Sequence, residues 1–521
     1  MIRKEREIKV IYVLVLAIFA VFLAVPIVRL LLESFLGEAG AGISNYVEVL
    51  TGQGFLQALG NSVAVSISSA LISTVLAFFM AYSIQYTNLP GKFKTVIRTL
   101  AVLPMLLPTI TYGFAIIYSF GKQGLLTRLF GRQLFDIYGF NGLLFGYVIY
   151  TLPISFMLIL NTIGFIDKKF MIVSRVMGDK PIQTFWQTII RPLLGTLAAS
   201  MVQCFFLCFT DYGIPASVGG EYEVVATVLY NEMLGSIPNF NRGAVVAMMM
   251  LIPSVVSIAL LKYLERYNVR YTKISQIELK KNPLRDGICG VGSAVLILCI
   301  LSVFAVIFVV PLVQEWPYQI NFTLEHFQAV FNDQSLFGVY QNSIFVAFCT
   351  ALLGLLVTYG AALATARSGL NGRLKGVIDA IALVTNTIPG MVIGIAFMFI
   401  FSGTALQNTF FLIILCNVVH FFSTPYLMMR NSLSKLNSSW ETTASLMGDT
   451  WIKTIVRIVT PNMTSTILEV FSYYFVNAMV NAVYEGETTD EANSSANPKT
   501  FPEPLTLDLL EKHQELSESC R

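Results

Sequence analysis

Long apolar runs separated by short polar segments are the dominant pattern along this chain of 521 residues. An apolar stretch of roughly 20 residues is long enough to cross a bilayer as a helix. We therefore predict an all-α polytopic membrane protein with about eleven spans, near residues 8–32, 61–84, 97–120, 141–164, 193–210, 243–263, 288–312, 343–366, 377–401, 409–429 and 463–484. The first run is too long for the apolar part of a cleaved signal peptide, so we expect it to remain as a helix.

Composition supports a membrane protein and narrows the chemistry. Only 12% of the residues are charged, whereas soluble domains carry about a quarter, and the mean hydropathy is +0.68. The seven cysteines show neither metal-ligand spacing nor a disulfide framework. No cluster of His, Asp and Glu has metal-ligand spacing, and no nucleophile constellation stands out. We therefore expect a protein that is not an enzyme, with no metal, no cofactor and no nucleic-acid partner.

The basic residues predict the orientation, because Lys and Arg gather on the cytoplasmic side of membrane proteins. With the N-terminus inside, most polar segments that carry Lys or Arg fall on the cytoplasmic side, including the connector 264–286. The outer segment 314–342 has acidic residues but no Lys or Arg. The segment 121–140 is the exception, because it places Lys122, Arg128 and Arg132 outside.

The chain repeats itself in parallel, as some transporters do. At an offset of 281, matching residues recur in both halves: Asn61 with Asn342, Ser62 with Ser343, Gly91 with Gly372, Lys94 with Lys375, Pro108 with Pro389, and Gly113 with Gly394. We therefore predict a first transmembrane domain at 1–263, a cytoplasmic connector at 264–286 and a second transmembrane domain at 287–484.

The end of the chain breaks the repeat. Residues 485–521 carry nine acidic residues against three basic ones and contain no spanning segment. We expect a polar tail that is disordered or aberrant, and a second half that lacks the last helix of the first. A lost reading frame near residue 481, a truncated variant and a natural disordered tail all fit this pattern.

Two polar islands sit at equivalent places in the repeat, at 437–461 and 167–192. In the first, Ser438 and Glu441 are typical of a capping box at the start of a short helix. Gly448 suits the left-handed position after a helix, and Asp449 can cap the next helix. Both islands contain Met-Gly-Asp, and each ends in a proline that suits the first turn of an apolar helix. These residues are Met177, Gly178, Asp179 and Pro192 in one copy and Met447, Gly448, Asp449 and Pro461 in the other.

The island at 437–461 resembles the cytoplasmic "EAA" loop of binding-protein-dependent ABC transporter permeases. The family pattern is Glu-Ala-Ala, three residues, Gly, nine residues, Ile, one residue and Leu-Pro. Ala444, Gly448, Ile458 and Pro461 match it, while Thr442, Thr443 and Thr460 replace the usual Glu, Ala and Leu. The other copy keeps Gly178 and Pro192 and is one residue longer between them. The resemblance covers about residues 60–484.

The resemblance implies a bacterial inner-membrane permease with both transmembrane domains fused in one chain. Such a permease would work with a dimer of a cytoplasmic ABC ATPase and with a periplasmic or lipid-anchored solute-binding protein. This chain has no Gly-x-x-x-x-Gly-Lys-Ser/Thr run of its own, so a separate subunit would hydrolyse ATP. The fused layout looks like permeases for ferric iron or 2-aminoethylphosphonate, and the Met-Gly-Asp loops incline slightly to the phosphonate type.

The two loops are candidate docking helices for the ATPase, and the alternative is that they are ordinary connectors. The predicted contact residues are Val176, Met177, Gly178, Asp179, Ala444, Met447, Gly448 and Asp449.

Five residues within apolar segments are candidates for the translocation path: Pro108, Gly113, Pro389, Gly394 and Glu469. Proline frees a backbone carbonyl and glycine lets helices approach, so each Pro-Gly pair could bend a helix at the path or simply serve packing. An intramembrane acid usually faces a cavity or a partner, but Glu469 could also lie near the interface.

A gradient-driven secondary transporter with a two-fold repeat is the alternative function, because such proteins also often have about twelve helices. It would need intramembrane charges for ion coupling, and this chain has few. A membrane scaffold that transports nothing is a further alternative. The residues do not identify the solute.

Overall fold

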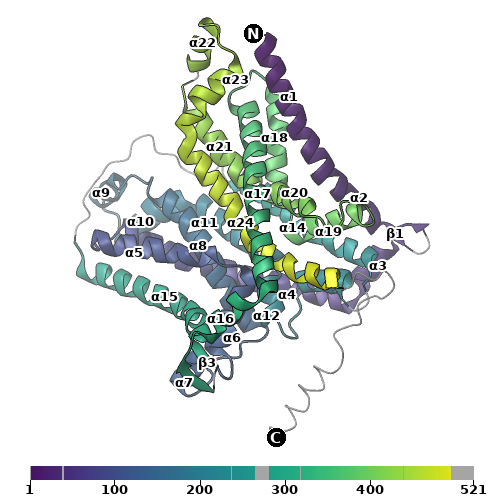
Figure 1. Cartoon of the computed structure of the whole chain (residues 1–521). Coiled ribbons are helices and arrows are strands. Elements are labelled where there is room, and N and C mark those ends of the chain that lie inside the picture. The colour runs from purple at the N-terminus through teal and green to yellow at the C-terminus, as the bar shows by residue number, and fades with distance from the viewer. Residues whose placement is uncertain are drawn as a thin grey trace.

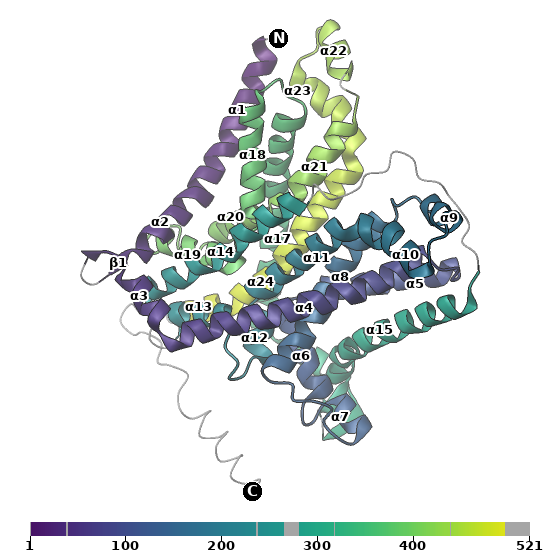
Figure 2. The same ribbon diagram turned by 180° about the vertical axis from the view of Figure 1, so that it is seen from behind.

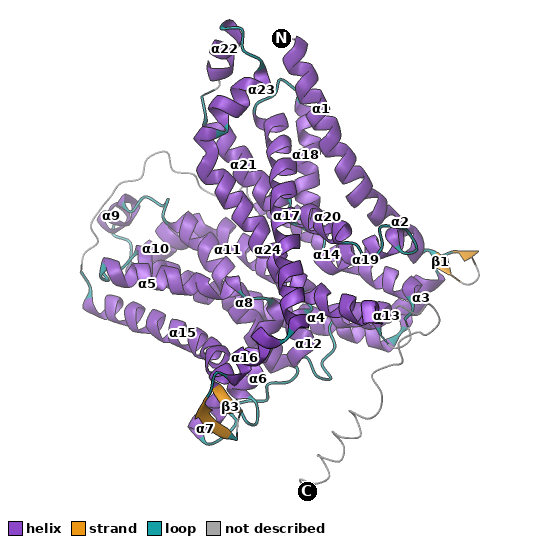
Figure 3. Ribbon diagram, viewed as in Figure 1, coloured by secondary structure: helices purple, strands orange, loops and turns teal. Residues whose placement is uncertain are grey.

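The computed structural model describes residues 2–37, 40–235, 238–264, 281–316, 318–437 and 439–494. Within these residues the chain is almost entirely helical, and its strands form two short antiparallel hairpins (Figure 3). The predictions for Ser438, for most of the connector 264–286 and for residues 495–521 lie outside the described residues.

The helical membrane fold is confirmed, with fewer clear spans than expected. Among the described residues, seven helices are long and apolar enough to cross a membrane, or up to ten if each of three bent helix pairs is one span. The helix expected at 463–484 forms as α24 (Thr464–Ser494) but is not among them. Polar side chains such as Glu469 and Asn477 lower its hydropathy.

The helix α24 continues past residue 484, where we expected the polar tail to begin. The backbone stays helical through Ser494. Adding a residue to an existing helix gains a hydrogen bond without a new nucleus, so a polar segment without proline can extend an apolar helix.

The two halves share one order of elements: an arm, a hairpin, a short helix, a helix of 33 residues, a broken helix pair, a bundle helix and a loop (Figure 1). The first half contains α1 (Ile2–Phe19), η1 (Ala20–Ala24), α2 (Val25–Ser34), β1 (Leu36–Gly37), β2 (Gly40–Ala41), α3 (Ser44–Thr51), α4 (Gln53–Gln85), α5 (Gly91–Val102), η2 (Leu103–Leu106), α6 (Thr109–Phe120), α7 (Leu125–Phe130), α8 (Phe140–Ile163), α9 (Lys169–Val176), α10 (Pro181–Phe185), η3 (Trp186–Ile190), α11 (Arg191–Thr210), α12 (Gly213–Val218), α13 (Val225–Leu234) and α14 (Phe240–Leu264).

The second half follows the same order up to α24, the counterpart of α11. It contains α15 (Pro283–Val309), η5 (Val310–Leu312), β3 (Val313–Glu315), β4 (Gln319–Phe322), α16 (Glu325–Asn332), α17 (Gln334–Ala366), α18 (Gly372–Thr385), α19 (Gly390–Phe401), α20 (Phe410–His420), α21 (Ser423–Lys435), α22 (Ser439–Leu446), α23 (Trp451–Thr454), η6 (Ile455–Val459), η7 (Pro461–Met463) and α24. Within the described residues α12, α13 and α14 have no counterpart here.

In each half, the first helical segment contacts helices of the other half. In the arm α1–α2, α1 packs on α17 of the second half, and α2 packs both on α19 of the second half and on α14 of its own half, while α15 packs on α4, α5 and α6 of the first half. On the α1 side, the rings of Phe19 and Phe422 lie 4.4 Å apart between centroids. The Tyr12 hydroxyl also donates a hydrogen bond of 3.0 Å to the carbonyl of Leu374.

The α15 side of this exchange uses similar contacts. The rings of Tyr112 and Phe304 lie 5.2 Å apart in an edge-on arrangement, and the Ser119 hydroxyl donates to the carbonyl of Val303 at 3.2 Å. The contacts of α1–α2 and α15 therefore cross the boundary between the sequence divisions 1–263 and 287–484. Apolar periodicity could not show this, because it marks a buried face without naming its partner.

Three spans that we expected to be continuous are broken. The segment 97–120 bends by 104° between α5 and α6, 377–401 bends by 104° between α18 and α19, and 409–429 bends by 57° between α20 and α21. At the first break, Pro108 lacks an N–H and holds Leu107 in an extended conformation. Pro389 stands at the same place in the second half. The equal angles show that the break is part of the repeat.

The helices of the two halves meet at one end of the molecule and spread apart toward α9 and α22 (Figures 1 and 2). The two Met-Gly-Asp loops therefore lie at separate corners. The N-terminal end of α1 lies at the same end as α22 in both views.

Candidate functional site: two exposed loops on a broken-helix bundle

The first Met-Gly-Asp loop is a tight turn between α9 and α10. Gly178 has a φ of +89°, the left-handed conformation that favours glycine after a helix end. The Asp179 carboxylate accepts a hydrogen bond of 2.6 Å from the Ser174 hydroxyl, whose oxygen can in turn accept from the Thr184 hydroxyl at 3.0 Å. These bonds tie the turn to the helices on both sides.

The second loop repeats the turn with different polar contacts. Gly448 has a φ of +83°, so the left-handed residue is confirmed here too. The expected cap at Asp449 is wrong: the hydroxyl of Thr450 caps α23 by accepting from the Lys453 N–H at 3.3 Å. Asp449 instead forms an ion pair with the Lys453 amine one turn away.

The tips of both loops expose large apolar side chains. Val176 and Met177 are 82% and 79% exposed, and Leu446 and Met447 are 85% and 80% exposed. Ala444, which we expected at the contact surface, is buried and faces the body of the loop. Exposed apolar side chains gathered at two matching tips are a feature of surfaces that meet another protein.

A π-helical turn precedes the proline at the exit of each loop, and the sequence pattern did not indicate it. The turns are η3, just before Pro192, and η6, just before Pro461. Pro192 and Pro461 stand in the first turn of α11 and η7, as we expected, but helical backbone already begins before them, at Pro181 and Trp451. The wider turn accommodates a proline that would otherwise clash with the preceding turn.

The two loops are fastened to the membrane helices in different ways. In the first half, the Lys168 amine donates to the carbonyl of Gln85 at 2.8 Å and lies 5.5 Å from the centroid of the Tyr86 ring. Burial lowers the pKa of the Lys168 amine.

In the second half, Arg367 at the end of α17 reaches the loop. Its Nε lies 2.9 Å from an oxygen of Glu441, and the two side chains are only 4% and 7% exposed. The other two guanidinium nitrogens donate to the carbonyls of Leu436 at 2.8 Å and Asn437 at 3.1 Å. The sequence pattern assigned Glu441 to a capping box, whereas the structure turns its carboxylate toward Arg367.

The Pro-Gly pairs lie at the broken helices, where the halves differ in one respect. A Cβ on Gly113 would lie 1.6 Å from the Ser217 hydroxyl oxygen, because α6 presses against α12 there. A Cβ on Gly394 would meet nothing within 4 Å. We predicted Pro108 and Gly113 within one helix, with a bend as one of two interpretations. Pro108 instead directly precedes α6, and Gly113 is a packing contact.

Glu469 lies on α24 with an exposed side chain. One of its carboxylate oxygens accepts a hydrogen bond of 3.3 Å from the Ser465 hydroxyl on the preceding turn. The described residues contain no group of three or more His, Cys, Asp or Glu side chains that could hold a metal ion.

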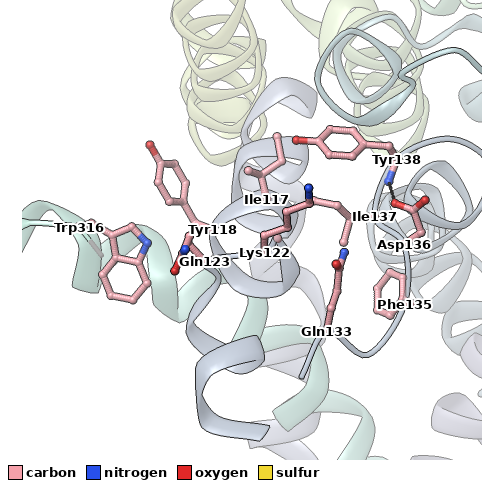
Figure 4. A pocket seen from close by; sticks show the side chains of 11 residues that line it. Ile117, Tyr118, Lys122, Gln123, Gln133, Phe135, Asp136, Ile137, Tyr138 and Trp316 are labelled. Carbon is pink, nitrogen blue, oxygen red and sulfur yellow. Dashed lines mark hydrogen bonds between the residues drawn. The ribbon is translucent and has the colours of Figure 1, made fainter. Parts of the chain in front are cut away.

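A cleft of about 800 Å³ lies beside α6, far from the loops. Figure 4 shows Trp316 and Tyr118 on one side of it, Asp136 and Tyr138 on the other, and Lys122 between them. Trp316 follows α15 in the second half, so both halves contribute to the cleft.

Comparison with known proteins identifies the class of this bundle. Residues 73–269 and 352–486 each match the family model of the binding-protein-dependent transport system inner membrane component. Together these matches cover more than half of the chain and follow the two repeats. The chain belongs to this family: it is a multi-pass inner-membrane permease component of a binding-protein-dependent ABC importer, and such permeases are not themselves enzymes.

Several curated proteins are similar over much of the chain. A putative ferric transport system permease protein, FbpB 1 of Haemophilus influenzae, is 24% identical over 88% of this chain and 74% of its own length. The ferric transport system permease protein FbpB of Actinobacillus pleuropneumoniae is 24% identical over 91% and 71%. The thiamine transport system permease protein ThiP of Salmonella typhimurium is 27% identical over 38% and 37%.

Proposed function

We propose that this permease carries ferric iron, which a solute-binding protein delivers to its extracytoplasmic face. The observation that carries this proposal is the similarity to two ferric transport permeases along about nine tenths of the chain. The other relative described above matches less than half of the chain. The family assignment also favours an ATP-driven importer over the gradient-driven alternative.

The two Met-Gly-Asp loops are the proposed docking elements for a dimer of a cytoplasmic ABC ATPase. The support is their repeated geometry, with a left-handed glycine in each turn, and the exposed apolar tips at Met177 and Met447. One loop belongs to each half, so each would take one ATPase subunit. The proposal implies that the loops and the N-terminus lie in the cytoplasm, and the distribution of basic residues supports this orientation.

The translocation path is proposed to run between the halves, beside the broken helices that follow Pro108 and Pro389. A backbone break at membrane depth is tolerated where it is buried in protein or lines a water-filled cavity. The loops at α9 and α22 lie at separate corners of the molecule (Figure 2). ATP binding would draw the two loops together and open the other side. We keep Gly394 and the exposed Glu469 as candidate path residues.

The test is uptake of radioactive ferric iron into proteoliposomes that hold this permease with its ATPase, in the presence of its binding protein. We expect uptake that requires ATP and all three components. Labelled 2-aminoethylphosphonate serves as the comparison solute. Uptake of 2-aminoethylphosphonate without uptake of iron would overturn the proposed substrate. Uptake without the ATPase would overturn the proposed mechanism.

The exchanged arms predict that the two halves hold together without the connector. Two fragments made by cutting the chain after residue 272, expressed together, should co-purify and retain most of the uptake, because α1–α2 and α15 each bury an apolar face against the other fragment. The measurement is co-purification through a tag on one fragment. The control pairs fragment 1–272 with residues 310–521, which lack α15. Equal recovery of both pairs would contradict the role of the arm.

A further inference from the structure

The two loops are not fastened equally to their long helices. Lys168 holds the first loop with one hydrogen bond to the end of α4 and a contact with the Tyr86 ring, and Phe185 of α10 packs its ring against those of Phe78 and Tyr82 on α4. Arg367 holds the second loop with one ion pair and two hydrogen bonds. The two attachments therefore differ in kind, because only the second is built on a buried ion pair.

The position of Arg367 gives these contacts a mechanical consequence. Arg367 is the residue directly after α17, and a guanidinium can hold several acceptors in one fixed plane. It joins three sites on the loop segment: the carbonyls of Leu436 and Asn437, just before α22, and the carboxylate of Glu441 within α22. A displacement of α22 is therefore carried to the end of α17 through direct contacts rather than through a flexible connector.

The helix α17 is well placed to distribute such a displacement. It packs along α24, α20 and α21 of its own half and along α1, the arm that belongs to the first half. The Thr358 hydroxyl lies 2.9 Å from the Tyr474 hydroxyl between α17 and α24, and Tyr359 reaches the Thr460 hydroxyl at 2.8 Å, close to η6. Movement of the end of α17 would thus reach both sides of the second half.

We propose that Arg367 is a positioning residue that couples the second Met-Gly-Asp loop to α17, so that movement of the loop is passed directly to this helix. This inference rests on the proposed function, because it assumes that the loop is moved by a docked ATPase. The ion pair is shielded from solvent, so ordinary salt weakens it little.

The decisive variant is Arg367→Met combined with Glu441→Met in the full chain. Replacing a buried ion pair by apolar residues of similar volume is often neutral for stability, whereas removing one partner leaves a buried charge. We expect the double variant to bind its ATPase and hydrolyse ATP as the unsubstituted protein does. The ferric iron taken up per ATP hydrolysed should fall about fivefold, the low end of typical coupling between sites.

Hydrogen exchange provides a second readout. In the double variant the backbone amides of residues 439–447 should exchange faster, because α22 has lost its anchor on α17. A merely structural role would lower the amount of assembled complex, uptake and ATP hydrolysis in parallel and leave their ratio unchanged.

Two further variants complete the experiment. Arg373→Gln removes an exposed arginine from α18 and should leave the ratio of uptake to hydrolysis unchanged. If the double variant does not insert into the membrane, Arg367→Lys replaces it as the test. A lysine ammonium can keep the ion pair with Glu441 but cannot also donate to the carbonyls of both Leu436 and Asn437. A lowered ratio in Arg367→Lys supports the inference.

The inference is overturned if the inserted double variant, or Arg367→Lys in its place, takes up as much iron per ATP as the unsubstituted protein. Failure of the proposed function looks different, since the unsubstituted complex itself would then show no ATP-driven uptake of iron.

Discussion

Replacing Gly448 by valine should uncouple ATP hydrolysis from transport and leave the protein inserted in the membrane. Gly448 has a φ of +83°, and an L-residue in a left-handed conformation costs roughly 1–2 kcal/mol, more for a β-branched side chain. Nothing lies within 4 Å of a Cβ placed there, so the substitution strains the turn without creating a clash. The turn between α22 and α23 would shift. Met447 would then no longer lie where we propose that it contacts the ATPase.

We expect solute transported per ATP hydrolysed to fall about tenfold, which corresponds to roughly 1.4 kcal/mol. The measurement is ATP hydrolysis and uptake in the same proteoliposomes. Gly448→Asn is the matched variant, because asparagine tolerates the left-handed region, and it should retain most of the coupling. Gly376→Val, in the exposed helix α18 with a helical backbone, should couple normally. Normal coupling in a well-inserted Gly448→Val protein would rule out this role of the turn.

Substitution of Gly113 by valine should damage the first half, while the same change at Gly394 in the second half should be tolerated. A Cβ at Gly113 would come within 1.6 Å of the Ser217 hydroxyl oxygen and 2.4 Å of its Cβ, so α6 and α12 would have to move apart. Overpacking of a well-packed interior typically costs about 1–3 kcal/mol. The matching position, Gly394, has open space around it.

The measurement is the thermal unfolding midpoint of the purified protein in detergent, together with its yield from the membrane. We expect Gly113→Val to lower both and Gly394→Val to leave both nearly unchanged. A compensating pair, Gly113→Ala with Ser217→Gly, should recover part of the loss because it removes the clashing side chain. Equal behaviour of the two valine variants would show that the contact between α6 and α12 is unimportant.

The class of the fold and the positions of the two loops could be predicted from the sequence. Apolar run length forces a helical membrane protein, since a bilayer leaves no water for unpaired backbone groups. The repeated Met-Gly-Asp turns fixed the left-handed conformation of Gly178 and Gly448, because a glycine after a helix end is favoured there for local steric reasons. These features depend on neighbours along the chain, which a sequence displays directly.

Interactions between distant segments decided the rest. The sequence could not show that α1–α2 and α15 exchange halves, because an apolar face does not identify its partner. It assigned Glu441 to a local cap, whereas tertiary packing placed Arg367, 74 positions earlier, against that carboxylate. It recognised Gly113 and Gly394 as equivalent, but only the presence of α12 beside one of them made that glycine a close contact. Local sterics set the turns and the helices, and long-range packing set which surfaces meet and what each residue does there.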